Sequence, residues 1–121
     1  MQMTLEECYR SFGGNYEDVL NRLCSQAFVG RFLVKFLADE SYEDLHRYLD
    51  EKNYEGAFRA AHTLKGVCQN LGIRNLYESD DAVTEALRGG KNEVTPEMLQ
   101  KLDADYDSVI RSIREYQKSA G

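Results

Sequence analysis

The chain has 121 residues, 42% of them hydrophobic and 30% charged, a length that suits one domain with a single core over residues 1–121. Its formal net charge of −6 opposes nucleic-acid binding, and it has neither an apolar stretch long enough for a membrane span nor a signal-peptide pattern, so we expect a cytoplasmic protein. Its 3 cysteines are widely spaced and form no CxxC pair, so we expect reduced thiols and no metal site.

The first part of the chain shows helical signals and no clean alternation typical of strands. Thr4 and Glu7 have the spacing of a capping box, which predicts a short helix within an N-terminal extension of residues 1–14. Asn15 can cap a second helix. A third is expected over residues 25–39, with a row of phenylalanines that should lie mostly in the core: Phe28, Phe32 and Phe36.

Helical signals continue to the end of the chain. Ser41 is expected to cap a fourth helix, with Asp44 three residues further on. The spacing of apolar residues then predicts helices over about residues 54–71, 73–87 and 95–116. Because the connections are short, we predict an all-α fold: an up-down antiparallel four-helix bundle over about residues 15–117, with one or two short N-terminal helices.

The helix expected at residues 54–71 presents a histidine to solvent. Its buried face is predicted to consist of Ala57, Ala61, Leu64, Cys68 and Leu71. His62 points away from that face, and Lys65, Gly66 and Gln69 follow it at i+3, i+4 and i+7 in one stripe. A neutral imidazole is a nucleophile that could take up a phosphoryl group, and a lysine one turn away could neutralise its charge. Glycine costs about 1 kcal/mol relative to alanine inside a helix, so the bare position at Gly66 suggests access for a large donor.

A lone histidine on a polar helix face is more often a solvated surface residue, and we expect His46 to be one. An aspartate at its i+4 position, Asp50, would repel phosphate. Phe58 projects near the stripe one turn before His62, either as a shielded edge residue or as part of a docking surface, and we favour docking. Arg59 lies on the other flank of His62 and would add to a small basic spot.

The stretch AAHTLKGVCQNLG, residues 60–72, closely resembles the signature of histidine-containing phosphotransfer (HPt) domains. In that signature the histidine is followed by Leu-Lys-Gly and, ten residues after the histidine, by another glycine. The positions in register are His62, Leu64, Lys65, Gly66 and Gly72. Gln69 lies where such domains often carry a polar residue near the phosphohistidine, and the resemblance independently implies a helical bundle.

The resemblance implies a phosphotransfer intermediate of a two-component phosphorelay. His62 would accept a phosphoryl group from the aspartyl phosphate of one receiver domain and pass it to another, with Lys65 and Gln69 stabilising the phosphate. The implied partners are response-regulator receivers and a hybrid histidine kinase, and the metal that activates the aspartyl phosphate would belong to the receiver. There is no GxxxxGK[ST] loop, so we expect no cofactor and no ATP site, and whether such a carrier counts as an enzyme stays open. Two alternatives remain: a non-phosphorylated adaptor or inhibitor that binds a receiver or kinase, and the phosphoacceptor segment of a larger kinase.

Overall fold

The computed structural model describes residues 2–120, and within them the regular secondary structure is entirely helical. In chain order the elements are α1 (Leu5–Ser11), α2 (Tyr16–Leu23), α3 (Gln26–Lys35), the 3₁₀ turn η1 (Phe36–Ala38), α4 (Ser41–Asp50), α5 (Tyr54–Leu71), α6 (Arg74–Leu87), the 3₁₀ turn η2 (Arg88–Gly90) and α7 (Pro96–Ala120). The predicted all-α class is confirmed. Nowhere in this part of the chain does a helix combine the length and apolarity that crossing a membrane requires.

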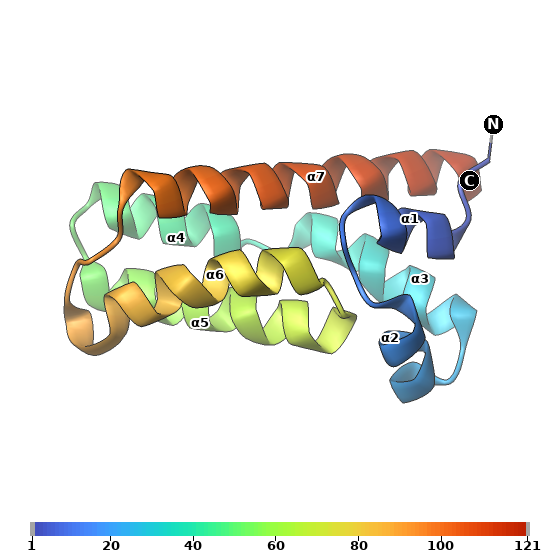
Figure 1. Ribbon diagram of the computed structural model, residues 1–121, viewed down its shortest axis with the longest axis horizontal. Coiled ribbons are helices and arrows are strands. Elements are labelled where there is room, and N and C mark those ends of the chain that lie inside the picture. Colours follow the sequence, from blue (N-terminus) through green and yellow to red (C-terminus); the bar gives the residue numbers. More distant parts are fainter. Residues whose placement is uncertain (1, 121) are drawn as a thin grey trace.

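Helices α4, α5, α6 and α7 pack in sequence, each against the one before it, and successive helices run in opposite directions (Figure 1). The long helix α7 extends past α4 to α1 and α3, which it also contacts (Figure 1). The core between these helices consists of fully buried aliphatic side chains, among them Leu33, Leu45, Leu64, Leu76, Leu102 and Ile113. Apolar burial of this kind is the main stabilising term of the fold.

Both ends of α5 form where the sequence predicts them. At its start, the Asn53 side chain accepts a hydrogen bond from the backbone N–H of Gly56 at 3.0 Å. At its end, Gly72 adopts the left-handed conformation with φ of 68°. A Cβ at Gly72 would lie 2.9 Å from the carbonyl oxygen of Asn15, so this position requires glycine for space as well as for conformation. These local signals fix which residues α5 presents to solvent.

Helix α1 is part of the core. It begins at the predicted capping box, in which Thr4 and Glu7 exchange two hydrogen bonds of 2.9 and 3.0 Å. The Tyr9 hydroxyl donates a hydrogen bond of 2.7 Å to the carbonyl oxygen of Leu71 at the end of α5. Tyr9, Cys8 and Phe12, which directly follows α1, are at most 2% exposed and belong to the hydrophobic core. A side-chain hydrogen bond therefore links α1 to the end of α5, the helix that carries His62.

The predictions for residues 25–50 are wrong in two respects. The helix expected over residues 25–39 ends at Lys35 and tightens into η1, after which the Asp39 carboxylate accepts a hydrogen bond of 2.8 Å from the backbone N–H of Ser41. Ser41 makes no capping hydrogen bond; it is the first, buried residue of α4, and Glu40 precedes it. The described chain has seven α-helices, one for each segment in which the sequence predicts a helix, and the predicted division into four bundle helices and one or two short N-terminal helices is not confirmed.

The phenylalanine row of α3 is only partly buried. Phe36 is 2% exposed, whereas Phe28 and Phe32 are 47% and 40% exposed. The two exposed rings stack at 6.3 Å between centroids, and Arg31 and Lys35 place cations 5.5 and 5.3 Å from them. The expectation that this row is mostly core fails for these two residues, because α3 packs inward through the neighbouring row that contains Val29 and Leu33.

Candidate functional site

His62 lies on the exposed face of α5, as predicted. The five residues of the expected buried face are at most 8% exposed: Ala57, Ala61, Leu64, Cys68 and Leu71. The His62 ring lies 5.8 Å from the ring of Phe58 one turn earlier. Among residues 2–120, no side chain forms a hydrogen bond or an ion pair with the nitrogens of the His62 ring. A ring nitrogen is therefore available to an incoming electrophile.

The space one turn after His62 is open. A Cβ built on Gly66 would meet nothing within 4 Å apart from its own helix backbone and chain neighbours. Gln69 follows on the same stripe and is exposed, while its backbone carbonyl accepts a hydrogen bond of 2.9 Å from Arg22 of α2. His62, Gly66 and Gln69 thus share one accessible face of α5.

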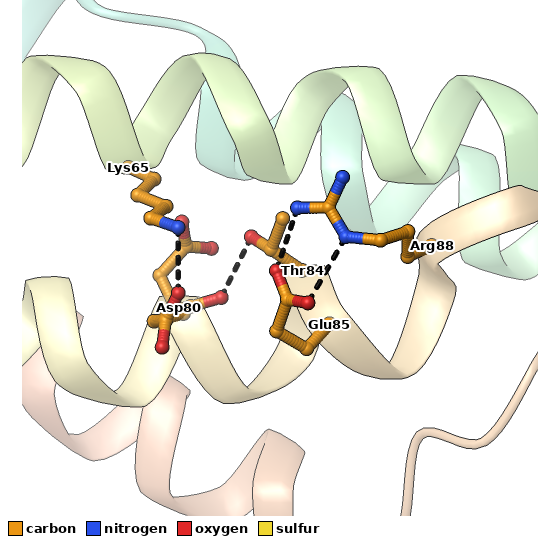
Figure 2. A network of polar contacts seen from close by, with 6 residues as sticks. Lys65, Asp80, Thr84, Glu85 and Arg88 are labelled. Atoms are coloured by element: carbon orange, nitrogen blue, oxygen red, sulfur yellow. Dashed lines mark hydrogen bonds and ion pairs between the residues drawn. The ribbon is translucent and has the colours of Figure 1, made fainter.

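Lys65, which the sequence places on the same stripe as His62, is not free in the structure. Its Nζ lies 2.6 Å from Oδ1 of Asp81 on α6, and its side chain is only 22% exposed. The same Nζ lies 5.8 Å from the centre of the Tyr77 ring. Figure 2 shows Lys65 extending from α5 toward α6. The hydrogen bond to Asp81 raises the pKa of Lys65, so the side chain stays an ammonium ion at neutral pH. The stripe therefore includes a cation, but one that already has a partner.

Asp80 lies next to this ion pair and was missed by the sequence analysis. It is fully buried, and neither of its carboxylate oxygens has a hydrogen-bond partner among the described residues. Burial, with a smaller contribution from the charge of Asp81, raises the pKa of Asp80 to about 8. The nearby Thr84 hydroxyl donates to the backbone carbonyl of Asp80 at 2.8 Å (Figure 2). Asp80 is therefore largely protonated near pH 7.

A second cation near the stripe, Arg88, also escaped the sequence analysis. It donates hydrogen bonds of 3.0 and 2.6 Å to the two carboxylate oxygens of Glu85 (Figure 2). Its guanidinium carbon lies 5.1 Å from the centre of the Phe58 ring, so Phe58 has Arg88 and His62 as neighbours. The spacing of Glu85 and Arg88 could have predicted their pairing. Their place beside Phe58 depends on how α6 packs against α5.

The two candidate docking residues differ in exposure. Phe58 is half-buried and packs against the core, as a shielded edge residue would. Arg59 is exposed and lines a hollow of about 190 Å³ on the α4 side, together with Asp44 and Thr63. The two side chains therefore flank His62 on opposite sides, one toward α6 and one toward α4.

His46 is not the free surface residue that was expected. It is half-buried on α4, and its Nε2 lies 2.7 Å from Oδ1 of Asp103 on α7. The hydroxyl of Tyr42 donates to the same carboxylate oxygen. A carboxylate next to the ring nitrogen would repel a phosphoryl group, so the environment of His46 lacks the features that distinguish His62.

A groove of about 430 Å³ lies beside the C-terminal half of α5. Its apolar lining comes from α2, α3, η1 and α5 through Leu23, Phe32, Phe36, Val67 and Leu71. Arg22 and Lys35 add two cations to its wall, with Asp39 as an acidic neighbour. The groove was not foreseen, because it forms between helices whose relative placement the sequence does not state.

The Hpt domain family model matches residues 33–112, which is more than half of the chain. The matched region runs from within α3 to within α7 and includes His62 and the whole of α5 and α6, while α1 and α2 precede it. No curated protein and no solved structure matches the chain. The chain therefore belongs to the Hpt domain family.

Proposed function

We propose that this protein is a phosphorelay intermediate that carries a phosphoryl group on His62 from one receiver domain to another. Membership in the Hpt domain family implies histidine phosphotransfer in phosphorelays. The observation that supports His62 most directly is its exposed ring, followed one turn later by open space at Gly66. A donor as large as a receiver domain needs that space to reach the imidazole.

The transfer is a displacement at phosphorus. The lone pair of an unprotonated ring nitrogen of His62 attacks the phosphorus of the receiver's aspartyl phosphate. The P–N bond forms as the P–O bond to the aspartate breaks, and the aspartate leaves as a carboxylate with the electron pair. Transfer to the second receiver reverses these steps. The chain itself contributes the nucleophile, its position and nearby positive charge.

Three neighbours of His62 have proposed roles in this transfer. Lys65 and Gln69 lie on the same stripe and would stabilise the phosphoryl oxygens, Lys65 by charge and Gln69 by hydrogen bonding. Gly66 would keep the approach open. Lys65 can serve in this way only by turning from Asp81, which it now contacts at 2.6 Å.

The receiver would dock on the surface that extends from His62 along α5 to the exposed rings of α3. Val67 on α5 and Phe32 on α3 both line the groove, and Phe32 also belongs to the exposed aromatic pair. Arg22 and Lys35 give this surface cations on a protein of net charge −6, which suits the acidic surroundings of a receiver's phosphorylated aspartate. Phe58 and Arg59 would contact the receiver at the other end of the same interface.

Phosphate transfer from a labelled receiver tests the proposal. We expect label on the wild type and on the His46→Gln variant, and none on His62→Gln, with an adduct that is labile in acid and stable in base, as phosphoramidates are. His46→Gln is the matched control because it removes the chain's other histidine, which Asp103 holds. Label retained by His62→Gln would refute the assignment. A wild type that binds receivers but takes no label would instead favour the adaptor function.

A further inference from the structure

Lys65 is held by a carboxylate before any phosphoryl group arrives. Its ammonium contacts Asp81 at 2.6 Å across the α5–α6 packing. The Asp81 side chain is 43% exposed, so the ion pair lies at the surface and can open without unpacking the core. The cation expected to neutralise a phosphohistidine thus starts with a different anionic partner.

The other acidic groups of α6 near Lys65 do not hold it. Asp80 is fully buried, and burial keeps it largely protonated because its pKa is raised to about 8. Glu85 binds Arg88 through two hydrogen bonds. Tyr77 offers the face of its ring, 5.8 Å from the ammonium, and no carboxylate. Asp81 is therefore the carboxylate that holds Lys65 in this structure.

A phosphoryl group on His62 and the carboxylate of Asp81 would compete for the ammonium of Lys65. Residues three apart on a helix have Cβ atoms about 5–6 Å apart, so the flexible lysine stem can direct the ammonium toward His62 or toward α6. A phosphoryl group bears roughly 1.5 to 2 negative charges near pH 7 when it is attached to a side-chain oxygen, and a comparable charge on His62 would attract Lys65 and repel Asp81. Both effects make Asp81 unfavourable to the phosphorylated state.

We propose that Asp81 is a positioning residue that competes with the phosphoryl group for Lys65 and thereby keeps the phosphohistidine ready for transfer. The inference rests on the proposed phosphorylation of His62. A carrier must release its phosphoryl group to the next receiver. If Lys65 bound the phosphoryl group tightly, it would stabilise the phosphohistidine and slow that release. Because the ion pair is partly exposed, the expected effect of removing it is a factor of about two to five.

The lifetime of the phosphohistidine tests the proposal. The full chain is phosphorylated with potassium phosphoramidate, a small donor that needs no protein partner: the P–N bond to His62 forms as the donor's P–N bond breaks and ammonia leaves. The loss of the phosphohistidine signal is then followed by ³¹P NMR. We expect Asp81→Asn to lengthen the lifetime two- to fivefold and to shift the transfer equilibrium with a phosphorylated receiver toward His62 by a similar factor. Asp81→Glu, which restores a carboxylate, should behave like the wild type.

Two further variants separate this role from a general effect of charge or folding. Asp105→Asn changes net charge by the same amount and breaks a Lys101–Asp105 ion pair of equal length, 2.6 Å, on α7; it should leave the lifetime unchanged. In a chain that already carries Lys65→Ala, Asp81→Asn should lengthen the phosphohistidine lifetime by less than half of the increase that it causes in the wild type. Far-UV circular dichroism and the melting temperature report folding separately from the lifetime.

The possible failures point to different conclusions. If the wild-type signal does not depend on His62, the proposed function itself fails. If His62 is phosphorylated and Asp81→Asn leaves the lifetime unchanged or shortens it, the proposed function stands and the competition is refuted; a shortened lifetime would mean that Asp81 orients Lys65 toward the phosphate. Equal lengthening with and without Lys65 would also overturn the proposal, because Asp81 would then act by repulsion alone.

Discussion

The burial of Asp80 makes stability depend on pH with a definite sign. An aspartate in the unfolded chain ionises near pH 4, whereas burial raises the pKa of Asp80 in the folded chain to about 8. Between these values the folded state retains a proton that the unfolded state has lost. The free energy of unfolding contributed by this group therefore falls as pH rises from about 4 to about 8, and is constant outside that window.

Asp80→Asn replaces the protonated acid by a neutral group of the same shape. It should leave the stability nearly unchanged at pH 4.5 and raise it at pH 8 by a few kcal/mol, since each pKa unit corresponds to about 1.4 kcal/mol. Urea unfolding of the wild type and the variant at both pH values measures this. The exposed Asp107→Asn serves as the control and should show little difference at either pH. A gain of equal size at both pH values would show that ionisation is not the cause.

Gly66 allows access and stability to be tested at one position. A Cβ there meets no neighbour within 4 Å, so Gly66→Ala should raise the free energy of unfolding by up to about 1 kcal/mol. At Gly56, by contrast, a Cβ would lie 2.6 Å from the Tyr48 ring, so Gly56→Ala should destabilise. Chemical denaturation of the two variants compares these expectations.

A larger residue at the same position separates access from folding. Gly66→Gln should stay folded and accept phosphate from phosphoramidate, which is small, but accept it slowly from a receiver domain. Parallel labelling with the two donors gives the ratio of rates. Equal slowing with both donors would contradict the access role, because it would show that the substitution disturbs the imidazole itself.

At the scale of the helices, sequence reasoning succeeded where the signals are local. The bounds of α5, its buried face and the exposure of His62 agree with the predictions made from helical spacing within one segment. The break after Lys35 was missed because the apolar pattern continues through η1. The Lys65–Asp81 pair could not be predicted, because it depends on how far α6 is shifted along α5.

One of the features that the sequence analysis missed, the burial of Asp80, could have been predicted from the spacing of apolar residues. Asp80 comes four residues after Leu76 and three before Val83, which places it on the buried row of α6. The exposure of Phe28 and Phe32 could not be predicted in this way, since an apolar residue looks the same whether or not another helix covers it. Periodicity predicts which face is apolar, and only tertiary packing decides which apolar residues stay uncovered.

The exposed face of α3 makes a prediction about docking. Phe32→Ala should lower receiver affinity roughly thirtyfold, as loss of a desolvated aromatic anchor commonly does, with little change in melting temperature because the ring is 40% exposed. Phe36→Ala, one turn further and 2% exposed, should instead destabilise by about 3–5 kcal/mol. Calorimetry of receiver binding and thermal melts of both variants distinguish the two positions. Unchanged receiver affinity in Phe32→Ala would place the interface elsewhere.

At the scale of the whole molecule, the fold extends beyond the region that the family model matches. The match begins at residue 33, yet α1 lies in the same core as the matched helices. The backbone N–H of Asn15 donates to the carbonyl of Gly72 at 2.8 Å, and that of Asn75 donates to the carbonyl of Gly13 at 3.1 Å. Backbone hydrogen bonds therefore connect residues 13–15, just before α2, to residues 72–75, which follow α5.

Deleting residues 1–14 should therefore remove most of the cooperative stability. It would strip from the core the side chains of Leu5, Cys8, Tyr9 and Phe12, each at most 8% exposed. Burial of one large apolar side chain contributes about 1.5–3 kcal/mol, so the combined loss is comparable with the roughly 5–15 kcal/mol that stabilises a whole domain. Thermal melts followed by circular dichroism, together with the dispersion of amide NMR signals, measure the outcome.

Tyr9→Phe is the control: it removes only the hydrogen bond to the Leu71 carbonyl and should lower the free energy of unfolding by about 1–2 kcal/mol. A truncated chain that melts within a few degrees of the full chain would show that α1 packs on a core already complete without it, and that the position of α5 does not depend on the N-terminal helix.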